Sequence, residues 1–345
     1  MKRSIGIIGG SGYIGAELLR MLAAHPGFEL VFASANTDCG MPIAQAQPHI
    51  AGLYPGLKFT ALQESFSRIK ECDLIFLAVP HGESMKVMPD LIAVPHIIDL
   101  GSDFRLKQAD LYREWYGFEH TLSAQLHNWQ YGLPELFREK LKAAKRIANP
   151  GCYATAVTLS MAPLLSAGLV QGTIVADCLS GTSGAGKGLK SELHFSNAHE
   201  NAYAYKVGSH QHTPEIEQSL STVAESQVTL SLTPHVVPMV RGIHATVSAE
   251  VDNGVTAAEI EGCFKEFYAG EPFVSLEPAP PSTKIVRGSN MALIYARLDH
   301  RVRRVIVTCV IDNLVKGAAG QALQNANLAL GFDETLGIPR AGFYP

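Results

Sequence analysis

The sequence has few of the features that define several classes of protein. Its six cysteines are scattered without a CxxC pair, so no dense disulfide framework is expected and a reducing compartment fits. Basic and acidic residues nearly balance, 28 against 32, which leaves no strongly positive surface for nucleic acid or an anionic membrane. No stretch reaches the roughly 20 apolar residues needed to span a bilayer. We therefore expect neither a nucleic-acid nor a membrane partner.

What is present is typical of an ordinary globular chain. The 345 residues suggest about two domains, and 47% hydrophobic against 17% charged residues excludes general disorder. The start, Met1-Lys2-Arg3, is similar to that of a signal peptide, but glycine-rich sequence follows and Glu17 and Arg20 interrupt any apolar run. We expect a cytoplasmic protein with a domain boundary near residue 150.

The first part of the chain predicts a parallel sheet. A short apolar run at 4–8 ends in a glycine turn, an amphipathic helix is predicted over 16–24, and a strand over 29–34. Strand, turn, helix and strand within about 30 residues form a βαβ unit, whose strands are parallel. Two more apolar runs, 74–79 and 96–100, predict further buried strands.

The second part predicts a different sheet. Asn149-Pro150-Gly151 breaks the chain, and a helix is expected over 153–165. The strands expected in a second, mainly antiparallel sheet are 173–179, 228–232, 243–251 and 304–311, and a small-residue helix follows Asn313. The fold class is therefore α/β with a mixed second domain.

The turn after the first strand fits the GxGxxG pattern of dinucleotide-binding loops. Glycines allow a tight turn and let the backbone approach a pyrophosphate at the positive end of a helix. A turn that merely packs helix on strand is the alternative. The residues expected to bind the cofactor are Gly10, Ser11, Gly12, Tyr13, Ile14 and Gly15.

The end of the second strand bears on which dinucleotide binds. The strand ends in Ser34, which is also expected to bind the cofactor, followed by Asn36 and Thr37, and Asp38 comes a little late for the usual ribose-binding acid. The missing carboxylate favours a 2′-phosphate. No Lys or Arg occurs between Arg20 and Lys58, so hydroxyls, backbone amides or a distant cation would have to bind that phosphate. NADP(H) is the predicted cofactor.

Cys152 stands at the predicted start of a helix. The unpaired N–H groups and helix dipole there can lower a thiol pKa from about 8.5 to roughly 3.5–7.5 and stabilise an oxyanion. A small buried hydrophobe is the alternative, and it suits Cys72, Cys178 and Cys309 in their apolar runs. Cys39, in a polar loop, stays open. We predict Cys152 as a nucleophile.

A nucleophilic cysteine needs a base, and His210-Gln-His212 is a close histidine pair. Thr213-Pro214 predicts a helix start, which places both histidines in the loop before it. The pair could act as base and substrate contact or lie in a solvated loop. No third ligand at suitable spacing supports a metal site, and none is predicted.

Gly181 to Lys187 matches the first seven positions of a nucleotide-phosphate loop. The hydroxyl residue that should follow the lysine is replaced by Gly188, so an ATPase or kinase is not expected. A loop that accommodates phosphate or a nicotinamide ribose remains open.

Taken together, these segments resemble the N-acetyl-gamma-glutamyl-phosphate reductases of arginine biosynthesis, within the semialdehyde dehydrogenases. The similar segments run in order along nearly the whole chain, and those around Cys152 and the histidine pair are the most specific. They are 9–17, 99–105, 149–153, 180–186, 210–216, 234–243 and 312–321.

The resemblance implies a Rossmann NADP-binding domain of residues 1–150 and 314–345, and a mixed α/β catalytic and dimerisation domain of residues 151–313. It implies a small acyl-phosphate substrate, a homo-oligomer (dimer or tetramer), and reduction through a thioester on Cys152. The roles it implies are Cys152 as nucleophile and His212 as acid/base; Arg105, His210 and Arg241 as substrate contacts; and Ser183, Gly184 and Asn313 at the nicotinamide end. The guanidinium groups suit phosphate and carboxylate, but either arginine could be an ordinary surface charge.

Three alternatives remain. Two share the chemistry: an aspartate-semialdehyde dehydrogenase, against which the segment after His210 argues, and a reductase of lysine biosynthesis acting on a substrate bound to an acidic carrier protein. The third is a non-catalytic dinucleotide-sensing regulator, against which Cys152 and the histidine pair argue.

Overall fold

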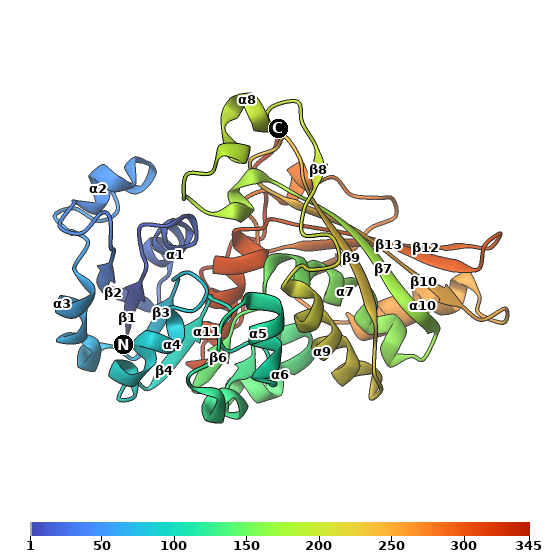
Figure 1. The fold of residues 1–345 in the computed structure, drawn as a ribbon, viewed down its shortest axis with the longest axis horizontal. Coiled ribbons are helices and arrows are strands. Elements are labelled where there is room, and N and C mark those ends of the chain that lie inside the picture. The colour runs from blue at the N-terminus through green and yellow to red at the C-terminus, as the bar shows by residue number, and fades with distance from the viewer. Residues whose placement is uncertain (1) are drawn as a thin grey trace. The chain divides into compact units, whose positions relative to one another are not determined.

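A computed structural model describes residues 2–345 (Figure 1). The chain divides into two compact units. Unit 1 contains the described residues up to Pro150 together with Ala318–Ile338, and unit 2 contains Gly151–Gly317 with Pro339–Pro345. Residues 314–317 and 339–345, which the sequence placed with the first domain, therefore group with unit 2. Within residues 2–345, no helix is long and apolar enough to cross a membrane.

Unit 1 is built on a six-stranded sheet in the order β2-β1-β3-β4-β6-β5, and every neighbouring pair is parallel. All four residues of β3 are buried, as expected for a parallel strand covered on both faces. The parallel sheet predicted from the apolar runs is confirmed. Its strands are β1 (Arg3–Ile8), β2 (Phe28–Ser34), β3 (Leu74–Leu77), β4 (His96–Asp99), β5 (Gln130–Tyr131) and β6 (Arg146–Ala148).

The helices of unit 1 are mostly short. The first begins at Tyr13, three residues earlier than the amphipathic pattern predicted, because the glycine turn continues directly into it. The helices are α1 (Tyr13–Ala24), α2 (Ile43–Ala46), α3 (Leu62–Phe66), α4 (Ser84–Val87), α5 (Asp110–Tyr116), α6 (Pro134–Lys142) and α11 (Gly320–Ala329). Four 3₁₀ turns lie at Pro48–Ile50, Ile69–Glu71, Met88–Leu91 and Ser123–Asn128.

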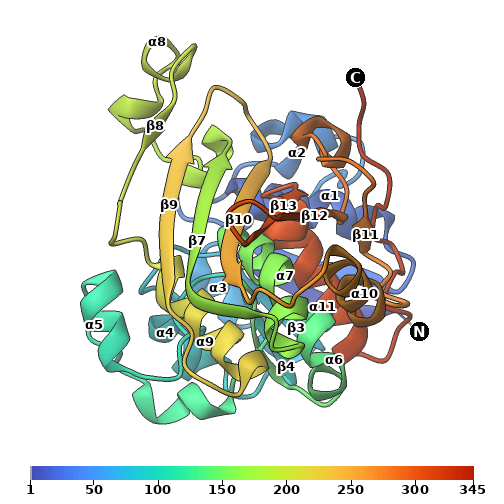
Figure 2. The same ribbon diagram turned by 90° about the vertical axis from the view of Figure 1, so that its right-hand side faces the viewer.

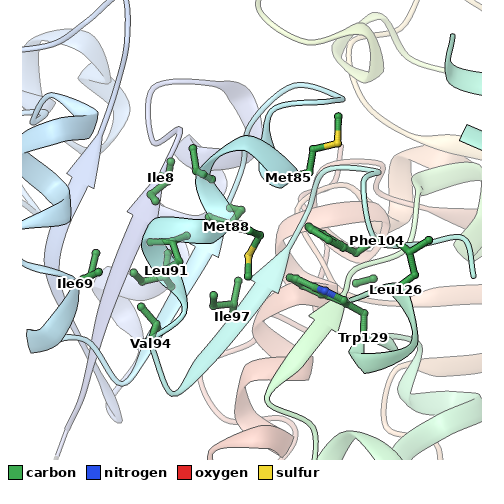
Figure 3. Packing of buried hydrophobic residues seen from close by; sticks show 14 of the residues in the cluster. Ile8, Ile69, Met85, Met88, Leu91, Val94, Ile97, Phe104, Leu126 and Trp129 are labelled. Carbon is green, nitrogen blue, oxygen red and sulfur yellow. The ribbon is translucent and has the colours of Figure 1, made fainter. Parts of the chain in front are cut away.

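A hydrophobic core packs against the strands of unit 1 (Figure 3). Phe104 and Trp129 stack at its edge with ring centroids 3.9 Å apart. Helix α11 is buried all along its length although it carries several amides. Its Gln321 and Asn325 side chains donate to the carbonyl of Gly132 at 3.1 and 2.8 Å, so these two amides tie the helix to the residue that follows β5.

Unit 2 is built on a seven-stranded sheet in the order β11-β12-β13-β10-β7-β9-β8 (Figures 1 and 2). Only the β7–β9 and β11–β12 pairs are parallel, so the mainly antiparallel sheet predicted from the sequence is confirmed. Its strands are β7 (Val170–Ser180), β8 (Tyr203–Ala204), β9 (Leu230–Val236), β10 (Ile243–Val251), β11 (Val274–Leu276), β12 (Ala292–Asp299) and β13 (Arg304–Ile311).

Helix α7 (Cys152–Ser166) is the central helix of unit 2. Residues 153–164 are all buried, and the helix packs against β10, β13, α9 (His212–Ala224) and α10 (Ala257–Phe267). The remaining helical segments are α8 (Phe195–Ala198), 3₁₀ turns at Thr182–Ala185, Ser191–Leu193 and Thr283–Val286, and a π-turn at Val315–Ala319. Cys152, the first residue of α7, therefore lies on a helix that packs against both the sheet and the helices of unit 2.

Candidate active site

Cys152 is the first residue of α7, and Gly151 is the extended residue before it, with φ −72° and ψ 155°. The Gly151 carbonyl accepts the N–H of Thr155 at 2.9 Å, the first hydrogen bond of the helix. The cysteine is only partly buried. A thiol in this place lies by the positive end of the helix, where a thiolate is stabilised.

Other cysteines have surroundings that oppose ionisation. Burial raises the pKa of Cys72 and Cys309 to about 12, and burial of Cys178 raises its pKa as well. Cys263, half-buried on α10, has its pKa raised to about 11, again mainly by burial. Cys39 is exposed. The sequence expectation that the apolar runs carry inert thiols agrees with these environments.

The histidine pair lies beside the cysteine. His212 is the first residue of α9, so the prediction that both histidines lie in the preceding loop is wrong for this one. The main-chain N–H of His212 donates to Nδ1 of His210 at 3.1 Å, and the centroids of the two imidazole rings are 4.7 Å apart. A Cβ on Gly151 would overlap with the His212 imidazole. The ring therefore lies directly against the residue that precedes Cys152.

Glu215 is a site residue that the sequence analysis missed. It lies one turn after His212 on α9, is fully buried, and its Oε1 accepts the N–H of Gly151 at 2.8 Å. Its carboxylate thus holds the peptide next to Cys152. An acid in the first turn of a helix ordinarily indicates interaction with that helix's own dipole, so its position alone did not reveal this contact.

Two tyrosines complete this region of unit 2. The Tyr205 hydroxyl donates to that of Tyr153 at 3.2 Å, and the Tyr153 hydroxyl donates to the carbonyl of His235 at 3.3 Å. The Tyr153 ring lies edge-on to the rings of both His210 and His212. Burial raises the pKa of both phenols far above the usual range, so they stay protonated as hydrogen-bond donors.

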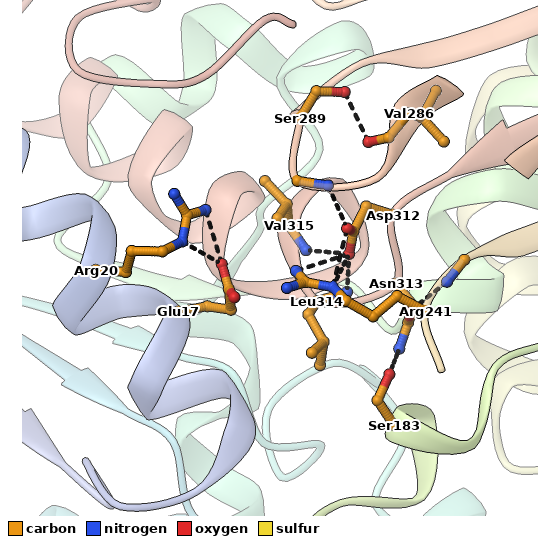
Figure 4. Close-up of polar contacts among 12 residues, drawn as sticks. Glu17, Arg20, Ser183, Arg241, Val286, Ser289, Asp312, Asn313, Leu314 and Val315 are labelled. Carbon is orange, nitrogen blue, oxygen red and sulfur yellow. Dashed lines mark hydrogen bonds and ion pairs between the residues drawn. The ribbon is translucent and has the colours of Figure 1, made fainter. Parts of the chain in front are cut away.

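Arg241 is paired with the fully buried Asp312 (Figure 4). Its Nε lies 3.1 Å from Oδ2 of Asp312, and its Nη2 donates to Oδ1 at 3.1 Å. The Asp312 carboxylate also accepts the N–H groups of Gly288, Leu314 and Val315 at 2.6, 2.8 and 3.2 Å. Arg241 is therefore not an ordinary surface charge.

The residues predicted at the nicotinamide end lie together. Asn313 donates from Nδ2 to the Ser183 hydroxyl at 2.9 Å and accepts the Gly242 N–H on Oδ1 at 2.7 Å. A Cβ on Gly184 would come within 3.8 Å of the same amide. Backbone N–H groups of this loop are already used, because Gly181, Thr182 and Ser183 donate to the carbonyls of Gly242, Met239 and Val240. These three amides are therefore engaged within unit 2 rather than directed at a phosphate.

The glycine loop lies at the end of β1 in unit 1. The carbonyl of Ser34 accepts the N–H groups of Gly9 and Gly10 at 3.2 and 2.7 Å, which fixes the turn on β2. A Cβ on Gly15 would lie 2.6 Å from the Cα of Gly10, so α1 can pack on the turn only with glycine there. Gly12 precedes Tyr13 at the start of α1 without a side-chain cap. A turn closed in this way before an uncapped helix fits a dinucleotide pyrophosphate.

Arg105 lies in unit 1 and is almost fully buried. Its Nε donates to the carbonyl of Asn149 at 2.8 Å and its Nη2 to that of Leu100 at 3.1 Å. Arg105, like Arg241, is therefore not an ordinary surface charge.

No candidate metal site is found among residues 2–345, which contain no group of three or more His, Cys, Asp or Glu side chains placed to hold an ion.

Two family models match the chain. The NAD binding domain of semialdehyde dehydrogenases matches residues 4–144, and the dimerisation domain of the same family matches residues 152–313. The first includes the glycine loop, and the second begins at Cys152.

Curated relatives match over nearly the whole chain. N-acetyl-gamma-glutamyl-phosphate reductase of Desulforamulus reducens is 45% identical, covering 99% of both chains. The enzyme of the same name from Symbiobacterium thermophilum is 46% identical over 100% of both, and that from Pseudomonas savastanoi is 44% identical over 99% of both.

Solved structures share the fold at low sequence identity. Aspartate semialdehyde dehydrogenase II complexed with ASA from Vibrio cholerae has a TM-score of 0.73 at 17% identity, covering 95% of this chain and 98% of that one. Aspartate semialdehyde dehydrogenase with NADP from Candida albicans has a TM-score of 0.65 at 15% identity, with the same coverage. The Rossmann and mixed-sheet fold is thus confirmed, and the chain belongs to the N-acetyl-gamma-glutamyl-phosphate reductases, a family of oxidoreductases within the semialdehyde dehydrogenases.

Proposed function

We propose that this chain catalyses the NADPH-dependent reductive dephosphorylation of N-acetyl-gamma-glutamyl phosphate to N-acetylglutamate 5-semialdehyde, a step of arginine biosynthesis. The observation that carries the proposal is the half-buried Cys152 at the start of α7, with the His212 imidazole against the preceding glycine. The names of the curated relatives support the same substrate.

Cys152 is the nucleophile in this proposal. Its thiolate attacks the γ-acyl carbon, the carbon–oxygen bond to phosphate breaks, and a thioester forms while phosphate leaves. N–H groups at the start of α7 stabilise the oxyanion that forms on the carbonyl. Arg105, held by two main-chain carbonyls, is our candidate for binding the phosphate, since guanidinium groups suit phosphate oxygens.

His212 moves the proton in both halves of the reaction. It takes the proton of the Cys152 thiol and later returns it to the sulfur as the thiohemiacetal collapses to the aldehyde. His210, which accepts the His212 N–H, is proposed as a substrate contact. Arg241, oriented by Asp312, is proposed to bind the substrate carboxylate, since a guanidinium group suits a carboxylate in charge and offers several N–H donors.

The cofactor proposed is NADP(H). Gly10 to Gly15 would hold its pyrophosphate, Ser34 its adenosine ribose, and Ser183, Gly184 and Asn313 its nicotinamide end. When bound, NADPH supplies the hydride that reduces the thioester carbonyl.

A homo-oligomer, dimer or tetramer, is proposed because the model matching residues 152–313 is that of a dimerisation domain. Light scattering after gel filtration tests the oligomeric state, and a monomer at micromolar concentration would refute the proposal.

A cytoplasmic location is supported by the six cysteines, none of which forms a disulfide in residues 2–345.

The proposed reaction is best tested in reverse. N-acetylglutamate semialdehyde and aspartate semialdehyde are offered in parallel with NADP⁺ or NAD⁺, with and without phosphate. We expect phosphate-dependent formation of NADPH with the acetylated aldehyde. Turnover of aspartate semialdehyde alone, or of neither aldehyde by protein that binds NADP⁺, would contradict the proposed substrate.

A further inference from the structure

Gly317 lies against the nucleophile. A Cβ on this residue would lie 2.8 Å from the Cβ of Cys152 and 3.2 Å from its Cα. Non-bonded carbon atoms pack at about 3.5–4.0 Å. Any side chain at position 317 would therefore overlap with Cys152, and one of the two residues would have to shift.

Gly317 is held in that place by an unusual turn. It is the middle residue of the π-turn Val315–Ala319, and its N–H donates to the carbonyl of Asp312, five residues earlier, at 2.9 Å. Turns of this type are rare and often occur at functional sites. The φ of Gly317 is not positive, so the need for glycine here comes from the space taken by Cys152 and not from the backbone conformation.

The contacts of Asp312 hold the π-turn in place against Cys152. While its carbonyl accepts the Gly317 N–H, its buried carboxylate is bound to Arg241 and to the amides of Gly288, Leu314 and Val315. A shift of Gly317 away from Cys152 would disturb this whole set of contacts. The overlap caused by a new side chain therefore falls mainly on Cys152.

We propose that Gly317 is a positioning residue: by lacking a side chain it leaves the space that Cys152 needs to present its thiolate to the substrate carbonyl beside His212. Gly151 leaves the matching space for the imidazole, so the reacting pair stands between two glycines. This inference rests on the proposed function in taking Cys152 as the nucleophile.

The first test is Gly317→Ala in the full-length protein, with Gly262→Ala as matched control. A Cβ on Gly262, in α10 of the same unit, meets no atom within 4 Å. For Gly317→Ala we expect the rate of Cys152 alkylation by iodoacetamide and kcat to fall about tenfold to a hundredfold, with NADP⁺ affinity unchanged. The control variant keeps all three values. A rate of Cys152 alkylation in Gly317→Ala equal to that of the wild type would overturn the inference.

A double-mutant cycle in thermal stability needs no activity. We expect Gly317→Ala to lower Tm by roughly 2–8 °C in the Cys152 protein, and by much less in a Cys152→Gly background, where the opposing Cβ is gone. An equal loss of Tm in both backgrounds would refute the contact. Turnover retained by Cys152→Ser would instead refute the proposed function, so the two failures are distinguishable.

Discussion

The two sheets of this chain differ in how they meet their surroundings. The parallel sheet of unit 1 has a fully buried strand at its centre, whereas β10 in unit 2 alternates buried and less buried residues along most of its length. The glycine loop follows a strand of the first sheet. Cys152 and His212, in contrast, are the first residues of helices α7 and α9, which belong to unit 2. The glycine loop on one side and Cys152 and His212 on the other thus belong to separate units.

Cys152→Ser is expected to have the largest effect of these variants and to separate turnover from cofactor binding most clearly. Because an alcohol at this position does not ionise as a thiol does, turnover should be abolished, while NADP⁺ affinity stays within about twofold, since Cys152 is not one of the proposed cofactor contacts. Steady-state assay and cofactor titration by fluorescence measure the two. Cys263→Ser, at a half-buried position on α10, is the control and should retain activity.

His212→Asn should slow the reaction by about 10²–10⁴-fold because the proton of the Cys152 thiol loses its acceptor. NADP⁺ affinity should again be unchanged. His210→Asn is the matched variant, with a smaller loss of kcat and a raised KM. If His212→Asn turned over normally and His210→Asn were slow, the roles of the two histidines would be exchanged.

Gly15→Ala tests the other unit. The added Cβ would overlap with the backbone of Gly10, so the turn must open, and NADP⁺ should bind roughly tenfold more weakly. Alkylation of Cys152 without cofactor should be unaffected. Gly52→Ala, where a Cβ meets no atom within 4 Å, is the control. A parallel loss of thiol reactivity would show that the two units are not separable in this way.

Asp99→Asn should have the smallest effect, on stability alone. Burial, with the nearby Asp103 as the second cause, raises the pKa of Asp99 to about 7. The folded protein therefore holds a proton that the unfolded chain releases near 3.8, so this residue's contribution to stability falls as pH rises toward and through 7.

An amide carries no such charge. At pH 8.5 we therefore expect Asp99→Asn to raise Tm relative to the parent, with a gain of about 1–3 kcal/mol at most in the free energy of unfolding. At pH 4 it should leave Tm nearly unchanged. Thermal unfolding at the two pH values measures this. Asp73→Asn, in a surface pair with Arg3, is the control. Equal changes of Tm at both pH values would show that folding does not raise the pKa of Asp99.

The parallel sheet was easier to predict than the mixed one for a physical reason. Strands such as β3 are buried on both faces and are therefore unbroken apolar runs. Strand β12 escaped prediction because its sequence, Ala-Leu-Ile-Tyr-Ala-Arg-Leu-Asp, mixes apolar and charged residues without clean alternation. It pairs antiparallel with β13, which follows directly after the turn at 300–303.

The site was predictable where chemistry depends on local sequence. A cysteine after Pro-Gly and two nearby histidines can be identified from the chain alone, as can the glycine turn. The contacts of Glu215 with Gly151 and of Asp312 with Arg241 span 64 and 71 positions. Such pairs are products of the tertiary fold, and no spacing rule along the sequence predicts them.

The π-turn at 315–319 has a consequence for how this chain can vary in length. A π-turn holds one residue more than an α-turn, and it leads directly into α11. Deleting one residue there would rotate α11 by about 100° relative to the turn. Gln321 and Asn325 would then turn away from the Gly132 carbonyl that both of them bind. Evolutionary insertions and deletions are therefore expected in the proline-rich loop at 276–284 rather than between Asp312 and Asn325, where the number of residues is constrained as strictly as their identity.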